Sequence, residues 1–174
     1  KTRPEFTFDT SFDEINDADL FHKQISSSKE GNKYSASVFV YPKEEYSTSK
    51  LFLTKDGKAG AAVTKDGDII SVFSYGEGKG RVPQIIINAI KEGGVSLDHY
   101  DTALTDYYYS FGFVPVAKVK WNDAYAPKDW NKDVFKKWNN GQPDVIAMAY
   151  HGGDPKTLHQ RIGKFSGLKE ALEK

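Results

Sequence analysis

Three short glycine-containing turns set the order of strands and helices in the middle of this chain. Lys55-Asp-Gly-Lys58 and Lys65-Asp-Gly67 each separate two short apolar runs, and an Asp-Gly turn joins neighbouring antiparallel strands. The third turn, residues 76–81, reads Gly-Glu-Gly-Lys-Gly-Arg and precedes a run that opens with Val82-Pro83. Because proline suits the first turn of a helix, we expect an antiparallel meander over residues 51–75, then a glycine-rich loop and a helix.

A strand that delivers a glycine-rich loop to the start of a helix can hold a phosphate group. Free backbone N–H groups and the positive end of the helix dipole meet at that point. The loop is not a Walker loop, because no Lys-Ser/Thr pair follows a glycine at the required spacing. Gly76, Gly78 and Gly80, with Asp98 further on, match a dinucleotide-binding fingerprint only in part. A connector without any ligand is the other interpretation of this loop.

A second pattern follows downstream, where residues 104–113 read Leu-Thr-Asp-Tyr-Tyr-Tyr-Ser-Phe-Gly-Phe. Tyr108 stands four residues before Gly112-Phe113. Together, in this order and over roughly residues 50–150, the loop and this pattern resemble the GNAT family of N-acetyltransferases. In that family a loop of the type Gln/Arg-x-x-Gly-x-Gly/Ala binds the pyrophosphate of acetyl-CoA, and a later helix ends in Tyr-x-x-x-Gly-Phe.

The resemblance and the turns predict an α+β fold built on a central mixed β-sheet. The expected order is a helical N-terminal region, an antiparallel meander, a strand-helix-strand-helix unit and a C-terminal hairpin, which is the order of the GNAT fold. Tight turns force antiparallel pairing, whereas a helix crossover permits parallel pairing. The expected helices are 12–28, capped by Asp13 or Asp17, one from Pro83 to Gly93, and 104–111. Residues 43–49 are expected to be a connector or a short helix. The expected strands are 35–41, 51–53, 60–64, 68–75, 95–100, 114–121 and 144–150.

The length of 174 residues suits one domain with a sizeable core. Within residues 1–174 we expect a polar N-terminal arm at 1–11, a loop-rich aromatic insertion at 122–143 and a C-terminal helical tail at 155–174. The insertion carries Tyr125, Trp130, Phe135 and Trp138. These aromatic side chains either line an acceptor pocket or lid, or pin the loop to the core.

Charge and composition exclude several classes of function. Lys plus Arg and Asp plus Glu number 24 each, so nucleic acid is not an expected partner. The chain has no cysteine, which excludes disulfides, thiol catalysis and cysteine-based zinc sites, and its four histidines lack metal-ligand spacing, so we expect no metal. No apolar run is long enough to cross a membrane and no signal-peptide pattern opens the chain, so we expect a cytoplasmic protein. The oligomeric state has no signature in the sequence.

Acyl transfer from a thioester to an amine needs a grip on the CoA phosphates, an oxyanion donor, a base and an acid. The phosphate grip would come from the backbone N–H groups of the loop, at Gly76, Gly78 and Gly80 above all. Lys79 and Arg81 would add positive charge, or are ordinary charges of the surface. The resemblance implies that main chain near Phe73 and Ser74, on the preceding strand, contacts the pantetheine and the thioester oxygen.

The acid would be Tyr108, because a phenol can protonate a departing thiolate. The alternative is that Tyr108 is a packed aromatic between Tyr107 and Tyr109. Many members of the family use a glutamate on the strand before the loop as the base, and residues 68–75 contain none. His99 and Asp101, which alternation places on one face of the next strand, are the candidates. A hydrogen-bonded or surface histidine, with water relaying the proton, is the alternative.

These features predict an acyl-CoA-dependent N-acyltransferase that uses acetyl-CoA as cosubstrate and acetylates an amine of a small molecule or a protein. The alternative is a module with the same fold that binds a ligand or partner without catalysis. The missing glutamate favours this alternative, and the three glycines of the loop oppose it. A nucleotide-binding domain of Rossmann type is the third interpretation.

Overall fold

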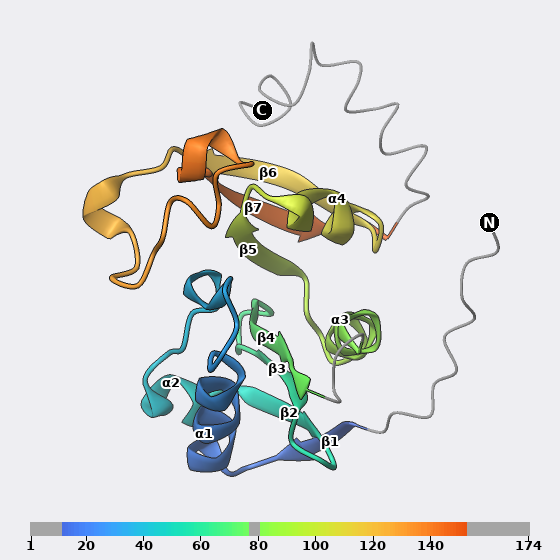
Figure 1. Ribbon diagram of the computed structural model, residues 1–174. Coiled ribbons are helices and arrows are strands. Elements are labelled where there is room, and N and C mark those ends of the chain that lie inside the picture. Colours follow the sequence, from blue (N-terminus) through green and yellow to red (C-terminus); the bar gives the residue numbers. More distant parts are fainter. Residues whose placement is uncertain (1–11, 77–80, 153–174) are drawn as a thin grey trace, which may run out of the picture. The chain divides into compact units, whose positions relative to one another are not determined.

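The computed structural model describes residues 12–76 and 81–152, and these fall into two compact units (Figure 1). Unit 1 contains residues up to Glu30 and Val38–Gly94, and unit 2 contains Gly31–Ser37 and the residues from Val95 onward. Each unit holds one β-sheet. The predicted arm at 1–11, the predicted tail at 155–174 and the loop residues Gly78, Lys79 and Gly80 lie outside the described residues.

The sheet of unit 1 is a four-stranded meander in the order β1-β2-β3-β4, with every pair of neighbours antiparallel. Its strands are β1 (Phe12–Ile15), β2 (Lys50–Thr54), β3 (Ala59–Val63) and β4 (Ile69–Ser74). The two Asp-Gly turns join β2 to β3 and β3 to β4. Gly57 and Gly67 have φ angles of 70° and 83° there, a region that glycine enters without steric cost. The predicted meander and its turns are therefore confirmed.

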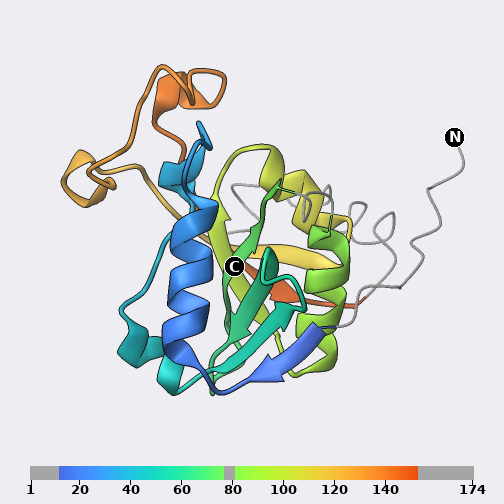
Figure 2. The same cartoon turned by 60° about the horizontal axis from the view of Figure 1, so that its bottom comes forward.

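The two faces of this sheet are covered by different helices, as Figure 2 shows for α1 and α3. One face packs against α1 (Ala18–Ser28) and α2 (Lys43–Ser47), and the other packs against α3 (Val82–Lys91). On the first face the buried core comprises Phe21, Ile25, Tyr46, Leu51, Leu53, Ala62, Ile70 and Phe73. On the second face the core comprises Ala59, Ala61 and Ile85. Because both faces are covered, β3 is buried at every position.

Two predictions for the N-terminal half were wrong. Residues 12–15 form β1 rather than the start of a helix, because they pair in register with β2 from Phe12–Thr54 to Ile15–Leu51. The helix begins only after Asp17, whose carboxylate accepts a hydrogen bond from the Leu20 amide at 2.9 Å. Of the two predicted caps, Asp17 is confirmed, and Asp13 lies in β1. Residues 35–41 form no strand. Ser35–Ser37 is a turn of 3₁₀ helix, and the amide of Tyr41 donates to a tyrosine hydroxyl instead of a neighbouring strand.

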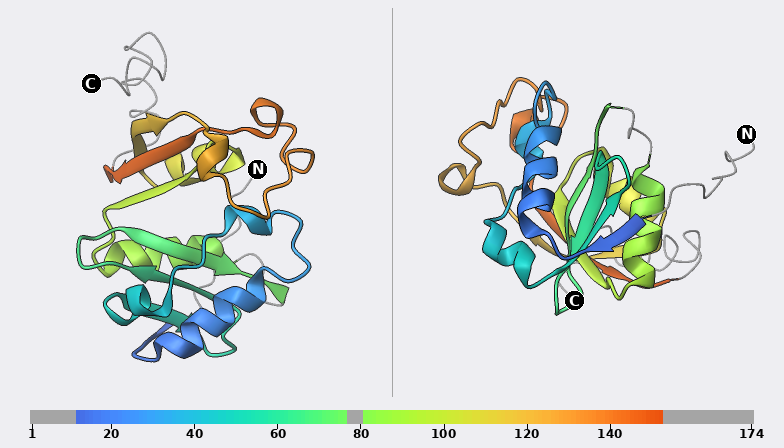
Figure 3. Two further views of the ribbon diagram at one scale, coloured as in Figure 1. Left: turned by 90° about the vertical axis from the view of Figure 1, so that its left-hand side faces the viewer. Right: turned by 90° about the horizontal axis from the view of Figure 1, so that it is seen from below.

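The sheet of unit 2 has three antiparallel strands in the order β5-β7-β6. They are β5 (Ser96–Tyr100), β6 (Phe113–Val119) and β7 (Val145–Tyr150), and α4 (Ala103–Tyr109) packs against β5 and β6. Figure 3 shows the chain leaving β6, forming a long loop and returning as β7. That loop is the predicted insertion at 122–143, and it contains only two turns of 3₁₀ helix, at Asp123–Tyr125 and Asn139–Gly141.

The predicted α+β class is confirmed, and so is the order of meander, strand-helix-strand-helix and C-terminal hairpin. The described strands are divided between two antiparallel sheets, whereas the sequence predicted one mixed sheet. A helical crossover such as α3 permits a parallel pair but does not require one, so connection lengths could not decide this point.

Gly60, the second residue of β3, provides a test of how tightly unit 1 is packed. A Cβ atom at this position would collide with the backbone oxygen of Phe52 and would lie 2.8 Å from Leu53 Cδ2. Gly60→Ala should therefore lower the free energy of unfolding by about 2–3 kcal/mol, measured by urea denaturation. Gly31→Ala is the control, because no atom lies within 4 Å of its added Cβ and only a φ of 70° opposes it, at about 1 kcal/mol. Equal losses for the two variants would contradict this packing.

Candidate functional site

The sequence predicted a phosphate-binding site at the start of α3, which belongs to unit 1. Arg81 is the residue before the first turn of α3, and Pro83 lies within that turn, as predicted. Gly76, at the other end of the predicted loop, has a φ of 55°, which favours glycine. The Gly76 end lies beside the β2–β3 turn, because the amide of Tyr75 donates to the Lys58 oxygen at 3.0 Å and a Cβ on Gly76 would lie 3.7 Å from Lys58 Cδ.

Arg81 forms a two-pronged ion pair with Asp56 of the β2–β3 turn. Both guanidinium nitrogens lie 3.0 Å from a carboxylate oxygen, the geometry in which arginine binds carboxylates and phosphates most strongly. The turn fixes Asp56 in place, because the carboxylate also accepts hydrogen bonds from the Thr54 hydroxyl at 2.6 Å and the Lys58 amide at 3.0 Å. The hydrogen bonds from Arg81 and then Thr54 hold the pKa of Asp56 well below its usual range.

Sequence reasoning missed Asp56, which it interpreted only as a turn residue. No local pattern pairs residue 56 with residue 81, so only the folded meander brings them together. Arg81 is therefore more than an isolated surface charge, and its side chain is one-quarter exposed.

The strand that leads to the loop has an irregular backbone. Gly60 and Ala62 of β3 pair with Phe73 and Ile70 of β4, so β4 carries one residue more than its partner between these pairs. The extra residue is a β-bulge, a feature that often accompanies functional sites. Phe73 is buried at 3% exposure and packs in the core, and Ser74 ends the strand. The predicted contacts of main chain at Phe73 and Ser74 with a ligand stay predictions.

Tyr108 is the buried member of the three consecutive tyrosines in unit 2. It is 8% exposed, whereas Tyr107 and Tyr109 are half-buried. Its ring packs edge-on against Phe113, with centroids 6.3 Å apart, and lies 5.1 Å from the ring of His99. Burial raises the pKa of Tyr108 far above its ordinary value, so the phenol keeps its proton at neutral pH.

His99 lies inside unit 2 with both ring nitrogens near internal partners. Nδ1 lies 2.8 Å from the Tyr100 oxygen and Nε2 lies 3.0 Å from Met148 Sδ. Burial lowers the pKa of His99 below its ordinary value, which favours the neutral ring. Asp101 follows β5 and accepts a hydrogen bond from the Thr105 hydroxyl at 2.7 Å. The role of His99 and Asp101 as a base stays a prediction.

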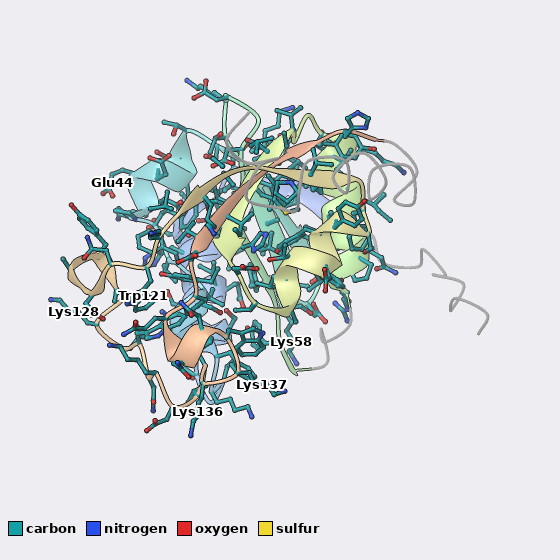
Figure 4. The ribbon with its side chains drawn as sticks, turned by 90° about the horizontal axis from the view of Figure 1, so that it is seen from above. Glu44, Lys58, Trp121, Lys128, Lys136 and Lys137 are labelled. Atoms are coloured by element: carbon teal, nitrogen blue, oxygen red, sulfur yellow. The ribbon has the colours of Figure 1, made fainter. Side chains whose placement is uncertain are left out.

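The aromatic insertion forms a cluster within unit 2. Trp130 stacks on Phe135 with centroids 3.9 Å apart, contacts Tyr100 and donates its indole N–H to the Gly141 oxygen at 2.8 Å. Phe135 is 2% exposed. These contacts favour a loop pinned to its own unit over an open lid. Figure 4 shows Lys128, Lys136 and Lys137 extending outward from the insertion, where all three are exposed.

Within residues 12–76 and 81–152, no three His, Asp or Glu side chains gather in a way that could hold a metal ion. Within the same residues, every helix is too short or too polar to cross a bilayer.

No protein-family model matches the sequence, and no curated protein matches it. Among solved structures, the fold is similar to that of a proposed acyl-CoA N-acyltransferase from Klebsiella pneumoniae subsp. pneumoniae. The similarity covers 79% of this chain and 95% of that chain, with 12% sequence identity and a TM-score of 0.40. At this level it establishes no shared activity, substrate or site.

The ion pair between Asp56 and Arg81 predicts a dependence of stability on pH. A carboxylate with a depressed pKa stabilises the fold above its unfolded pKa of about 3.9, and this contribution is lost as the pH falls further. Asp56→Asn should therefore lower the free energy of unfolding at pH 7 by about 0.5–1 kcal/mol, a value limited by solvent screening.

The difference between wild type and Asp56→Asn should shrink as the pH falls below about 4. Urea denaturation at pH 7, 5 and 3 measures it. The matched control is Asp66→Asn, an exposed aspartate of the other Asp-Gly turn. A loss that is the same for both variants at pH 7, or that persists unchanged at pH 3, would contradict the ion pair.

Proposed function

We propose that this protein is an acyl-CoA-dependent N-acyltransferase that transfers an acetyl group from acetyl-CoA to an amine. The observation that supports it most directly is in unit 1. There, a bulged β4 leads through Gly76 to the N-terminus of α3, and Arg81 stands at that terminus with its guanidinium fixed. Backbone N–H groups at a helix start and an oriented guanidinium together suit a pyrophosphate.

The chemistry assigned to unit 2 is proton donation by Tyr108. In the reaction the amine nitrogen forms a bond to the thioester carbonyl carbon, the C–S bond breaks, and the departing thiolate takes a proton. The Tyr108 phenol is protonated at neutral pH, and it would give that proton to the thiolate sulfur. The proton lost by the amine passes to water or to His99. The His99 ring is predominantly neutral because burial lowers its pKa, as a base requires.

The second candidate is a module of the same fold that binds without catalysis. It is favoured by the absence of a glutamate from β4 and by the internal contacts of both His99 nitrogens. The two functions differ in turnover but not in CoA binding.

Titration calorimetry with CoA, acetyl-CoA and NAD tests the proposed site. Gly78→Val should lower CoA affinity by at least tenfold, or about 1.4 kcal/mol, because a branched side chain blocks close approach of backbone to phosphate. Circular dichroism checks that the fold is intact. Unchanged CoA affinity would rule out the loop as the phosphate site, and binding of NAD in place of CoA would point to a dinucleotide-binding protein.

Tyr108→Phe tests the general acid, since it removes only the hydroxyl. With a panel of amines, kcat should fall by roughly 100-fold or more while acetyl-CoA binding changes little. Tyr107→Phe and Tyr109→Phe are the matched controls and should be nearly silent. Equal losses at all three positions would mean that the tyrosines act by packing. Absence of turnover by wild type with every amine would favour the non-catalytic module.

A further inference from the structure

The backbone of β4 contains a strained residue that has no part in the proposed reaction. Ser71 has a φ of 56°, in the left-handed region, and it lies in the stretch where β4 carries its extra residue. An L-residue pays about 1 kcal/mol to stay there, a cost that glycine would avoid. A strained non-glycine residue persists only where its surroundings over-determine it, and such residues cluster at functional sites. The side chain of Ser71 therefore needs an explanation.

The hydroxyl of Ser71 lies 2.7 Å from the hydroxyl of Tyr46, a fully buried residue of α2. The Tyr46 oxygen also accepts a hydrogen bond from the Tyr41 amide at 3.0 Å, and the Ser71 hydroxyl can donate to the Phe39 oxygen at 3.5 Å. Each hydroxyl has one proton, so one order satisfies every group. The Tyr41 amide donates to Tyr46, Tyr46 donates to Ser71, and Ser71 donates to Phe39.

This order closes a ring of hydrogen bonds on residues 39–41. The two ends of the ring, the Phe39 carbonyl and the Tyr41 amide, belong to the segment that was predicted as a strand. Two side-chain hydroxyls thus replace the backbone ladder that a strand would have made with its neighbour. Burial raises the pKa of Tyr46, and its hydrogen bonds with Ser71 and Tyr41 offset this only in part, so the phenol that the ring requires stays protonated.

We propose that Tyr46 and Ser71 are positioning residues that latch residues 39–41 to the bulge of β4 and hold the β4 backbone for acyl transfer. The catalytic part of this proposal rests on the proposed function, because Phe73 and Ser74 follow the bulge directly. The latch itself rests only on unit 1. It also explains why serine occupies a position where glycine would be less strained, since glycine has no hydroxyl to complete the ring.

Hydrogen exchange of backbone amides tests the latch without any activity. Tyr46→Phe fills the same space but removes the acceptor of the Tyr41 amide, so this amide should exchange at least tenfold faster, and Ser71→Ala should act in the same direction. In the double variant the Tyr41 amide should exchange no faster than in Tyr46→Phe alone, because the effects of coupled groups are not additive. Tyr75→Phe is the matched control. It removes a hydroxyl that bonds Gln24 at 2.9 Å in the same unit and should leave Tyr41 unchanged.

Ser71→Gly distinguishes the effect of the backbone strain from the effect of losing the hydroxyl. It should unfold at a higher temperature than Ser71→Ala because it relieves the positive φ, yet its Tyr41 amide should exchange as fast as in Ser71→Ala. Unchanged exchange at Tyr41 in Tyr46→Phe would overturn the latch. This result does not depend on whether the protein has any enzymatic activity.

Kinetics with acetyl-CoA and an accepted amine test the positioning role. Tyr46→Phe should lower kcat about tenfold while the dissociation constant of CoA, measured by calorimetry, stays within about twofold. Faster exchange at Tyr41 with unchanged kcat would show that the latch is only structural and would overturn its positioning role. A wild type without turnover would remove the proposed function and the positioning role with it, while the exchange data would still decide the latch.

Discussion

The sheet of unit 1 has to bury both of its faces, and the rest of that unit follows from this requirement. With α1 and α2 on one face and α3 on the other, β2 and β3 can carry almost no polar side chain in the interior. The same requirement forces residue 60 to be glycine, because β2 and β4 approach β3 too closely for a side chain there. Polar side chains therefore lie mainly at the ends of the sheet and on its edge strands.

The two polar groupings of unit 1 lie at those places. At one end of the sheet, the β2–β3 turn presents Asp56 to Arg81 at the start of α3. At the edge, the bulge of β4 turns Ser71 toward Tyr46. Each grouping links segments that are distant in sequence through short hydrogen bonds. An arginine already held in a two-pronged pair has a defined orientation, and a latched bulge has a defined backbone. Both are conditions for a preorganised binding site.

Unit 2 is built on a smaller sheet of three strands, with α4 packed against β5 and β6. Aromatic side chains add much of its buried apolar surface, with Trp130 and Phe135 stacked in the insertion and Tyr108 packed on Phe113. The two aromatic groups have different consequences. The insertion is pinned by its contacts, whereas the buried ring of Tyr108 packs against the rings of Phe113 and His99.

The sequence by itself determined the meander, the α3 and α4 helices and the closing hairpin, because Asp-Gly turns, Pro83 and Gly93 act through local backbone geometry. It did not determine that residues 12–15 form β1 or that residues 35–41 form no strand. Those outcomes depend on which partner takes the backbone hydrogen bonds. This partner is β2, far along the chain, in one case and the side-chain hydroxyl of Tyr46 in the other. It pointed to Arg81 and Tyr108 through motifs. Asp56, Tyr46 and Ser71 carry no local signature, and only tertiary structure brings them to their partners.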